Sequence, residues 1–260
     1  MTAFAEGALT LAIDGDVATL AFDRPAKRNA ITLAMWRALP EACAAFAVSD
    51  AKVLVVTGRG GHFAAGADIS EFEAVYATPE SAADYNAAIA AGVAAIAEQE
   101  KPVLAAIEGA CVGGGLAIAL ACDLRIAAAD ARLAITPAKL GLTYSLEDTK
   151  RLVDAVGASA ARDILFTGRL LSADEAVRLR LVDAVEDDIP AAVTTKAAEI
   201  AAASQRSVRA IKATIRAILG GAVKDDAATR AAFVASVSGP DFIEGRSAFL
   251  EKRKPEFPER

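Results

Sequence analysis

The sequence predicts an α/β protein, on two observations about the order of its segments. A unit of short apolar strand, glycine-rich loop and helix recurs along the chain, and from about Ser172 onward the pattern is mostly helical. The chain has 260 residues, 54% of them hydrophobic, which is ample for a buried core and excludes global disorder. We therefore expect a core in residues 1–190 and a helical C-terminal region in residues 191–260.

The N-terminal part predicts a hairpin, a helix and a buried strand. Apolar segments from Leu9 to Ile13 and from Val17 to Phe22 flank Asp14-Gly15, which accepts the positive φ values of a two-residue turn. After a loop, Thr32 can cap a helix whose apolar residues recur at three- and four-residue spacing. These residues are Leu33, Trp36, Leu39, Cys43 and Phe46. Lys52 to Thr57 lacks polar alternation, which is typical of a parallel strand covered on both faces.

The middle of the chain repeats this order. Val103 to Ile107 predicts a strand that runs into the glycine-rich loop Glu108 to Gly115, and this loop opens a helix from Leu116 to Cys122. Leu124 to Ala127 and Arg132 to Ile135 predict two further short strands.

The last third predicts helices. Ser172 and Glu175 have the spacing of a capping box, and Val182 to Val185 predicts one more strand. Four helices are expected after it: Ala191 to Ala203, Val208 to Leu219, Ala227 to Val237 and Phe242 to Arg253. A helical region that has apolar faces and lies outside a complete core usually packs against a partner.

Charge and composition exclude several classes of function. A net charge of −6 gives no basic field, which disfavours nucleic acid and anionic membranes as partners. The longest apolar stretches are shorter than the roughly 18 to 20 residues of a membrane span. Three cysteines without C-x-x-C spacing, and no secretory leader, lead us to expect a reducing, cytoplasmic location. One histidine cannot supply a histidine-based metal cluster, so we expect no metal.

Two segments are candidates for supplying backbone N–H donors to an anion. Small residues between Gly58 and Ile69 follow a buried strand, where the chain can turn and expose the amide of Ala67. Gly113-Gly-Gly115 opens a helix, where unpaired N–H groups and the positive end of the dipole favour an anion. Two such amides on one carbonyl oxygen make an oxyanion hole, which stabilises an enolate or a tetrahedral anion. The alternative is that these glycines only allow tight turns and close helix packing.

Taken together, six motifs resemble the crotonase, or enoyl-CoA hydratase/isomerase, superfamily. In chain order they are Arg24-Pro-x-Lys-Arg-Asn-Ala-Ile31, Phe63-Ala-Ala-Gly-Ala-Asp-Ile69, Gly109-x-x-x-Gly-Gly-Gly115, Cys122-Asp123, Gly168 with Ala173-x-Glu-Ala176, and Phe249-x-Glu-Lys-Arg-Lys-Pro-x-Phe257. They cover nearly the whole chain. The resemblance implies a ClpP/crotonase-like spiral of β-β-α units, with C-terminal helices in 191–260 that assemble trimers or hexamers.

The resemblance also implies a substrate and a site. The substrate is an acyl-CoA thioester whose carbonyl lies between the amides of Ala67 and Gly114, with no cofactor other than the CoA of the substrate itself. The positions that the resemblance assigns to CoA are Arg24, Lys27, Arg28, Ala65, Asp68, Ile69, Phe233 and Lys252. Phe233 and Lys252 are expected to touch CoA held by the neighbouring subunit.

The chain departs from the hydratases of this superfamily at two positions. Those enzymes place one glutamate three residues after the second oxyanion glycine and another in a P-E-x-x-L-G type of motif. Here these positions carry Ala117 and, counted back from Gly141, Pro137. Neither side chain can transfer a proton, so the usual acid–base pair for adding water is missing. Isomerisation or decarboxylation then becomes the expected chemistry.

A tyrosine is the first candidate for proton transfer. The segment from Thr136 to Tyr144 has a T-P-x-x-L-G-x-x-Y pattern similar to the methylmalonyl-CoA decarboxylase branch of the superfamily, whose matching tyrosine lies in the active site. Glu147 is the second candidate, although Ser145, Glu147 and Asp148 also have the spacing that begins a helix. A different class of function is a non-catalytic acyl-CoA-binding protein, and turnover of an acyl-CoA would separate the two.

Overall fold

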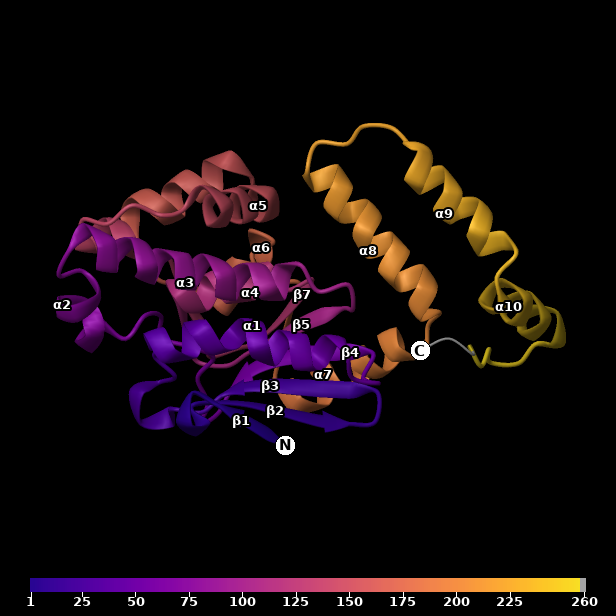
Figure 1. The fold of residues 1–260 in the computed structure, drawn as a ribbon, viewed down its shortest axis with the longest axis horizontal. Helices are drawn as coiled ribbons and strands as arrows, with labels where there is room; N and C mark the ends of the chain where they lie inside the picture. The colour runs from indigo at the N-terminus through magenta and orange to yellow at the C-terminus, as the bar shows by residue number, and fades with distance from the viewer. Residues whose placement is uncertain (258–260) are drawn as a thin grey trace.

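The computed structural model describes residues 1–257 and confirms the α/β class (Figure 1). A seven-stranded sheet has the order β1-β2-β3-β4-β5-β7-β10. Its strands are β1 (Thr2–Phe4), β2 (Leu9–Asp14), β3 (Val17–Phe22), β4 (Val53–Gly58), β5 (Val103–Ile107), β7 (Leu124–Ala128) and β10 (Ala184–Glu186). A second sheet contains β6 (Ala110–Val112), β8 (Arg132–Ala134) and β9 (Leu171–Ser172). Residues 258–260 of the predicted C-terminal region lie outside the described part of the chain.

Ten α-helices lie within the described residues, and they are labelled in chain order in Figure 1. They are α1 (Leu33–Ala47), α2 (Phe72–Val75), α3 (Pro79–Ala97), α4 (Gly114–Ala121), α5 (Leu146–Thr167), α6 (Ala173–Arg178), α7 (Ile189–Ala201), α8 (Gln205–Leu219), α9 (Ala227–Val237) and α10 (Pro240–Glu251). Short 3-10 helices cover Ala5–Gly7, Pro25–Lys27, Ile69–Glu71 and Pro137–Leu140.

The predicted hairpin and first helix are confirmed. β2 and β3 pair antiparallel, with Asp14 opposite Val17 at the turn. Thr32 caps α1 through its side chain, which accepts a hydrogen bond of 3.2 Å from the amide of Met35. This bond satisfies one of the donors that a helix start leaves unpaired.

The glycine-rich loop before α4 differs from the prediction. Residues Ala110–Val112 form strand β6, which pairs parallel with β8, where we expected a loop. The helix also starts earlier than predicted, at Gly114, directly after Gly113 with a left-handed φ of 54°. The sequence did not indicate this strand because it is only three residues long and is flanked by glycines, a pattern typical of a turn.

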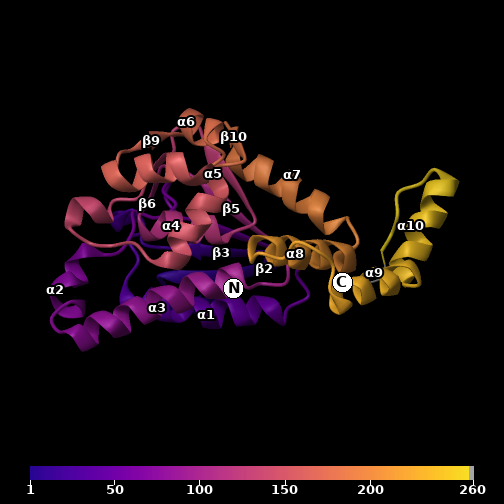
Figure 2. The same ribbon diagram turned by 90° about the horizontal axis from the view of Figure 1, so that it is seen from above.

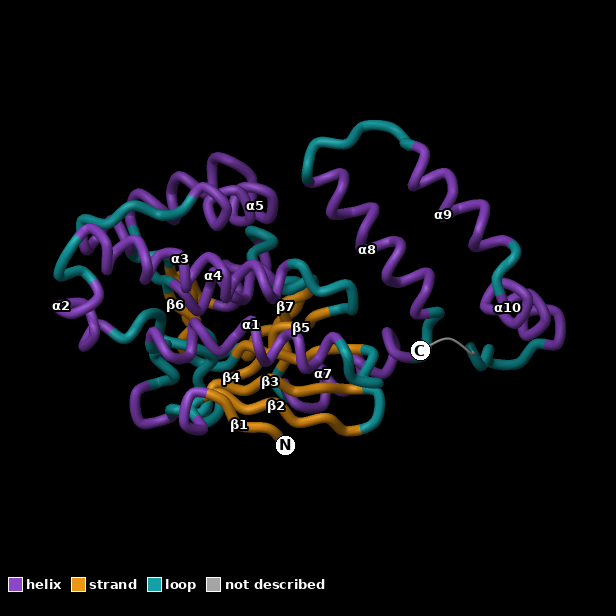
Figure 3. The backbone as a smooth tube through the Cα atoms, in the orientation of Figure 1, coloured by secondary structure: helices purple, strands orange, loops and turns teal. Residues whose placement is uncertain are grey.

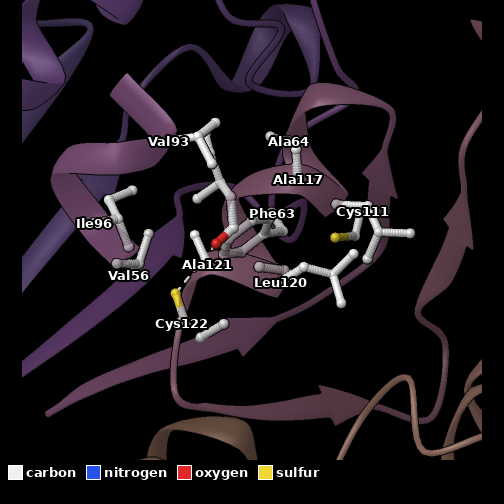
Figure 4. Packing of buried hydrophobic residues seen from close by; sticks show 14 of the residues in the cluster. Val56, Phe63, Ala64, Val93, Ile96, Cys111, Ala117, Leu120, Ala121 and Cys122 are labelled. Atoms are coloured by element: carbon white, nitrogen blue, oxygen red, sulfur yellow. Dashed lines mark hydrogen bonds between the residues drawn. The ribbon is translucent and has the colours of Figure 1, made fainter. Parts of the chain in front are cut away.

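Strand β4 separates two apolar clusters, one on each face of the sheet. Leu54 and Val56 belong to the larger cluster, which includes α1, α3 and α4, whereas Val53 and Val55 pack with α7. Successive side chains of a strand point to opposite faces, so both faces of β4 must be covered. Figure 4 shows part of the larger cluster, with Val56, Val93 and Ala117 among its members.

Helix α7 belongs to the core, because it packs on one face of the sheet. Its buried residues Ile189, Val193 and Ala197 complete the cluster on the second face of the sheet (Figure 2). The predicted division at residues 190 and 191 therefore falls at the start of a helix that packs on the core. Judged by which residues pack on the sheet, the C-terminal region that extends from the core begins after Ala201.

Helices α8, α9 and α10 form an arm that extends from the rest of the molecule (Figures 1 and 3). Helix α8 is tied to the core by Lys212, which donates to Asp123, and by Arg216, which donates to the carbonyls of Ala97 and Gln99. Helices α9 and α10 expose large apolar side chains, namely Phe233, Val234, Val237, Phe242, Ile243, Phe249 and Leu250. Such a surface is typical of a protein interface.

Candidate active site

The amide of Ala67 is held by a short strand-like contact with Ile31. Ile31 donates its N–H to Gly66 O at 2.8 Å and accepts at its O a bond of 2.9 Å from Asp68 N. The C=O of Gly66 and the N–H of Asp68, on either side of Ala67, both face Ile31. In an extended chain the N–H of the residue between them points to the opposite side, so the N–H of Ala67 points away from Ile31. It donates no hydrogen bond to any residue in 1–257.

The second amide belongs to Gly114, the first residue of α4. A helix leaves its first N–H groups without an internal partner. The preceding amide, of Gly113, donates to Ala134 O at 2.8 Å, whereas that of Gly114 has no acceptor among the described residues. Gly114 N therefore stands free at the positive end of the α4 dipole.

The fold brings these two amides together. A Cβ atom placed on Gly114 would lie 3.9 Å from Ala67 N, and one placed on Gly66 would lie 3.8 Å from Gly114 N. Two unpaired donors beside a helix N-terminus suit negative charge on an oxygen. That both N–H groups reach one thioester oxygen stays a prediction.

Tyr144, the first candidate for proton transfer, has a buried hydroxyl without a hydrogen-bond partner within residues 1–257. Burial raises the pKa of this phenol far above its ordinary value, and the nearby Asp148 and Cys111 raise it further, while Arg151 acts in the opposite sense. Cys111 lies on β6, the strand that leads to Gly114. The phenol is therefore protonated at neutral pH.

Glu147, the second candidate, is exposed on α5. It lines a groove of about 940 Å³ between α8 and the core, together with Leu120 and Ala121 at the C-terminal end of α4. Gly114 lies at the other end of that helix. Which of the two candidates transfers a proton stays a prediction.

The helix start predicted at Ser145 is confirmed. Ser145 Oγ accepts a bond of 3.0 Å from the amide of Asp148, and it donates to the Asp148 carboxylate at 2.8 Å. Asp148 also accepts from Arg151 at 2.9 Å. These contacts cap α5 and fix the chain that carries Tyr144.

Ala117 and Pro137 are the residues at the two positions where the resemblance predicted the hydratase glutamates. Ala117 is 1% exposed, one turn along α4, and its amide donates to Gly113 O. Pro137 begins a 3-10 helix. Neither element therefore brings a carboxylate to the free amides from these two positions.

The core residues predicted to bind CoA form one connected edge. Arg24 donates to the Asp68 carboxylate at 2.9 Å, and Ala65 N donates to Arg28 O at 2.9 Å. Lys27 and Arg28 are exposed, so their positive charge is available to phosphates. Ile69 is also exposed, at 63%. The structure thus gathers these residues next to the Ala67 amide, and their contact with CoA stays a prediction.

Asp68 is the buried anchor of this edge. Its carboxylate accepts from Ser70 N at 3.1 Å and caps the 3-10 helix that follows. Desolvation acts to raise the pKa of Asp68, but hydrogen bonds from Ser70 and Arg24 outweigh it, so that the pKa is lowered. Asp68 is therefore ionised at neutral pH.

Helix α9, which carries Phe233, and helix α10, which Lys252 caps, lie apart from α4, whose first residue is Gly114 (Figures 1 and 2). Phe233 on α9 is 72% exposed, and Lys252 ends α10 in a left-handed conformation. Within one chain they do not join the other predicted CoA residues. Their predicted contact with CoA requires a neighbouring copy.

Two residues have structural contacts that the sequence did not reveal. Trp36, predicted only as an apolar helix position, has its indole edge next to Gly114. His62 accepts a hydrogen bond of 3.1 Å at Nδ1 from the amide of Ala110, which ties the first glycine-rich segment to β6. Within residues 1–257, no group of three or more potential metal ligands comes together, and no helix is long and apolar enough to span a bilayer.

Comparison with known proteins gives the family. The model of the enoyl-CoA hydratase/isomerase family matches residues 12–260. A crotonyl-CoA hydratase from Syntrophomonas wolfei is 33% identical, covering 93% of this chain and 94% of its own. A peroxisomal Δ(3,5)-Δ(2,4)-dienoyl-CoA isomerase from Arabidopsis thaliana is 30% identical, covering 94% and 93%.

Solved structures agree with these relatives. An enoyl-CoA hydratase/isomerase family protein from Hyphomonas neptunium superposes with a TM-score of 0.95 at 44% identity, covering 97% of this chain and 98% of its own. An enoyl-CoA hydratase/carnitine racemase from Magnetospirillum magneticum gives a TM-score of 0.92 at 34% identity, covering 97% and 96%. The chain therefore has the predicted crotonase fold and belongs to the enoyl-CoA hydratase/isomerase family of the crotonase superfamily.

Proposed function

We propose that this protein converts an acyl-CoA thioester through an enolate that the amides of Ala67 and Gly114 stabilise. The observation that carries the proposal is the pair of unpaired N–H groups beside the N-terminus of α4. Removing one oxyanion donor from an enzyme costs about 100- to 1000-fold in kcat, so these two donors supply much of the catalysis. The CoA part of the substrate lies along Arg24, Lys27, Arg28, Ala65, Asp68 and Ile69, and no other cofactor takes part.

The reaction is isomerisation or decarboxylation rather than hydration. Adding water needs one group to activate the water and another to handle the proton at the α-carbon, and Ala117 and Pro137 do neither. In decarboxylation, the electron pair of the broken C–C bond passes into the enolate as CO₂ leaves. The α-carbon then takes one proton. Tyr144 supplies it, since its buried phenol is protonated, and solvent restores the proton afterwards.

The active form is a trimer or a hexamer of this chain. Helices α9 and α10 expose apolar side chains that a monomer would leave in water, and α8 lines an apolar groove. A neighbouring copy covers this surface and brings Phe233 and Lys252 to the CoA site. Lys252 then adds a positive charge for the CoA phosphates.

The test is steady-state turnover of methylmalonyl-CoA, a 3-enoyl-CoA and crotonyl-CoA by the parent and by Tyr144→Phe. We expect crotonyl-CoA to be hydrated poorly, and Tyr144→Phe to lower kcat on the preferred substrate by about 100-fold. Glu147→Gln tests the second candidate: a loss of kcat as large as that expected for Tyr144→Phe would assign the proton transfer to Glu147 instead. Fast hydration of crotonyl-CoA that Tyr144→Phe leaves unchanged would contradict the assignment of the chemistry. Tight acyl-CoA binding without turnover would favour the non-catalytic alternative.

A further inference from the structure

The indole of Trp36 on α1 leaves room only for a glycine at position 114. A Cβ atom placed on Gly114 would lie 2.8 Å from Cζ2 and 3.1 Å from Cη2 of the indole, and its next neighbour would be Ala67 N at 3.9 Å. The φ of Gly114 is not in the left-handed region, so its backbone accepts an L residue. The indole, rather than backbone strain, excludes a side chain there.

The indole itself is fixed from the opposite side. A Cβ atom placed on Gly92 of α3 would lie 3.1 Å from Cε3 of Trp36. Trp36 is fully buried, and its side chain also interacts with that of Tyr85, a buried residue of α3. Packing between two glycines on two helices thus contributes to the position of the ring.

The same stretch of chain also holds the first amide. Ile31, which orients Ala67 through two backbone hydrogen bonds, lies just before the Thr32 cap of α1, and Trp36 follows in the first turns of that helix. One rigid unit, residues 31–36, therefore contacts both donor segments. We propose that Trp36 is a positioning residue of the oxyanion hole, which sets the distance of the Gly114 N–H from the Ala67 N–H. This inference rests on the proposed function.

A suppressor experiment tests the contact. Gly114→Ala adds a methyl group that the indole excludes, and we expect kcat to fall about 100-fold, since a displacement of about 1 Å in an active site has an effect of this size. Trp36→Phe removes Cζ2 and Cη2, the two atoms nearest to the added methyl group. We expect the Trp36→Phe, Gly114→Ala double variant to regain at least tenfold in kcat over Gly114→Ala, with KM nearly constant.

The matched control uses the same helix. Phe46 is also fully buried on α1, at its far end, and Phe46→Leu loosens the core without reaching Gly114. Combined with Gly114→Ala, it should give no recovery. Equal recovery with Phe46→Leu, or additive effects of Trp36→Phe and Gly114→Ala on kcat, would overturn the proposal.

Two further measurements separate this inference from the proposed function. One is the affinity for butyryl-CoA relative to CoA, which needs no turnover and should fall in Gly114→Ala and recover in the double variant. The other is fluorescence of Trp36, the only tryptophan in the chain, which should respond to butyryl-CoA more than to CoA. If the parent turns over no acyl-CoA but the affinities follow this pattern, the proposed chemistry fails while the positioning role holds. If the affinities do not follow it, or the parent binds neither compound, the positioning role is overturned.

Discussion

At the scale of single residues, the site depends on groups whose charge is fixed by their surroundings. The phenol of Tyr144 stays protonated because burial raises its pKa, whereas Asp68 stays ionised because hydrogen bonds from Ser70 and Arg24 outweigh the effect of desolvation on its pKa. The proposed proton donor and the anchor of the predicted CoA edge thus hold opposite protonation states at one pH.

Asp68 gives a prediction about pH. Its pKa is lower in the folded protein than in the unfolded chain, so its contribution to the free energy of unfolding is present above the unfolded value of about 3.9 and is lost as the pH falls through the folded pKa. Asp68→Asn keeps a side chain that caps a helix but loses the ion pair with Arg24. Urea unfolding should show the variant less stable than the parent at pH 6, with the difference shrinking below about pH 4. A difference that is constant with pH would contradict this role, and Asp68→Ala should cost about 1 kcal/mol more through the lost cap.

The free amides could be predicted from sequence, whereas the contact that fixes one of them could not. Glycines after a strand and at a helix start are unusual enough to point to Ala67 and Gly114. Trp36 occupies a position with ordinary helical periodicity, so its pattern is that of any core residue. Only the close packing of α1 against α3 and α4 shows that its ring touches Gly114.

At the scale of elements, prediction succeeded where local signals were strong. The hairpin, the buried strand β4 and the caps at Thr32 and Ser145 follow from turn chemistry, apolar runs and hydroxyl side chains. Helix α3 was not predicted, because its alanine-rich sequence gives weak contrast between its faces. Strand β6 was missed because it forms only through a distant partner, β8.

Helix α8 is held on the core by a partly buried ion pair. Lys212 Nζ donates to Asp123 at 2.7 Å and to Lys101 O at 2.9 Å, and the Lys212 side chain is only 11% exposed. Lys212→Met should lower the free energy of unfolding by about 2 kcal/mol, the size of a lost hydrogen bond to a charged group, and should speed hydrogen exchange in α8. Lys196→Met, which removes an exposed pair with Glu199 on α7, should change stability by less than about 0.5 kcal/mol. Equal effects of the two variants would show that Lys212 does not anchor the arm.

At the scale of the whole molecule, one chain carries the two parts of the proposed CoA site far apart. Arg24 and Arg28 bond to Asp68 and Ala65, close to Ala67 in the chain, whereas Lys252 caps α10 in the arm, which extends from the core (Figure 1). The arm exposes apolar side chains, including Phe233, that a neighbouring copy would cover. Sequence could predict this arm as helical, but its direction depends on packing that only the fold reveals.

A shared site makes a prediction about mixed oligomers. Lys252→Ala should weaken CoA binding about tenfold and reduce its salt dependence, because one charge–phosphate contact is lost. Ala67→Pro should abolish activity, because proline has no N–H to donate. Mixing the two variants places an intact Lys252 beside an intact Ala67 amide in some sites, so turnover at low acyl-CoA concentration should exceed the sum of the separate variants. Sedimentation and circular dichroism check that each variant still folds and assembles, and turnover that only equals the sum would show that each chain completes its own CoA site.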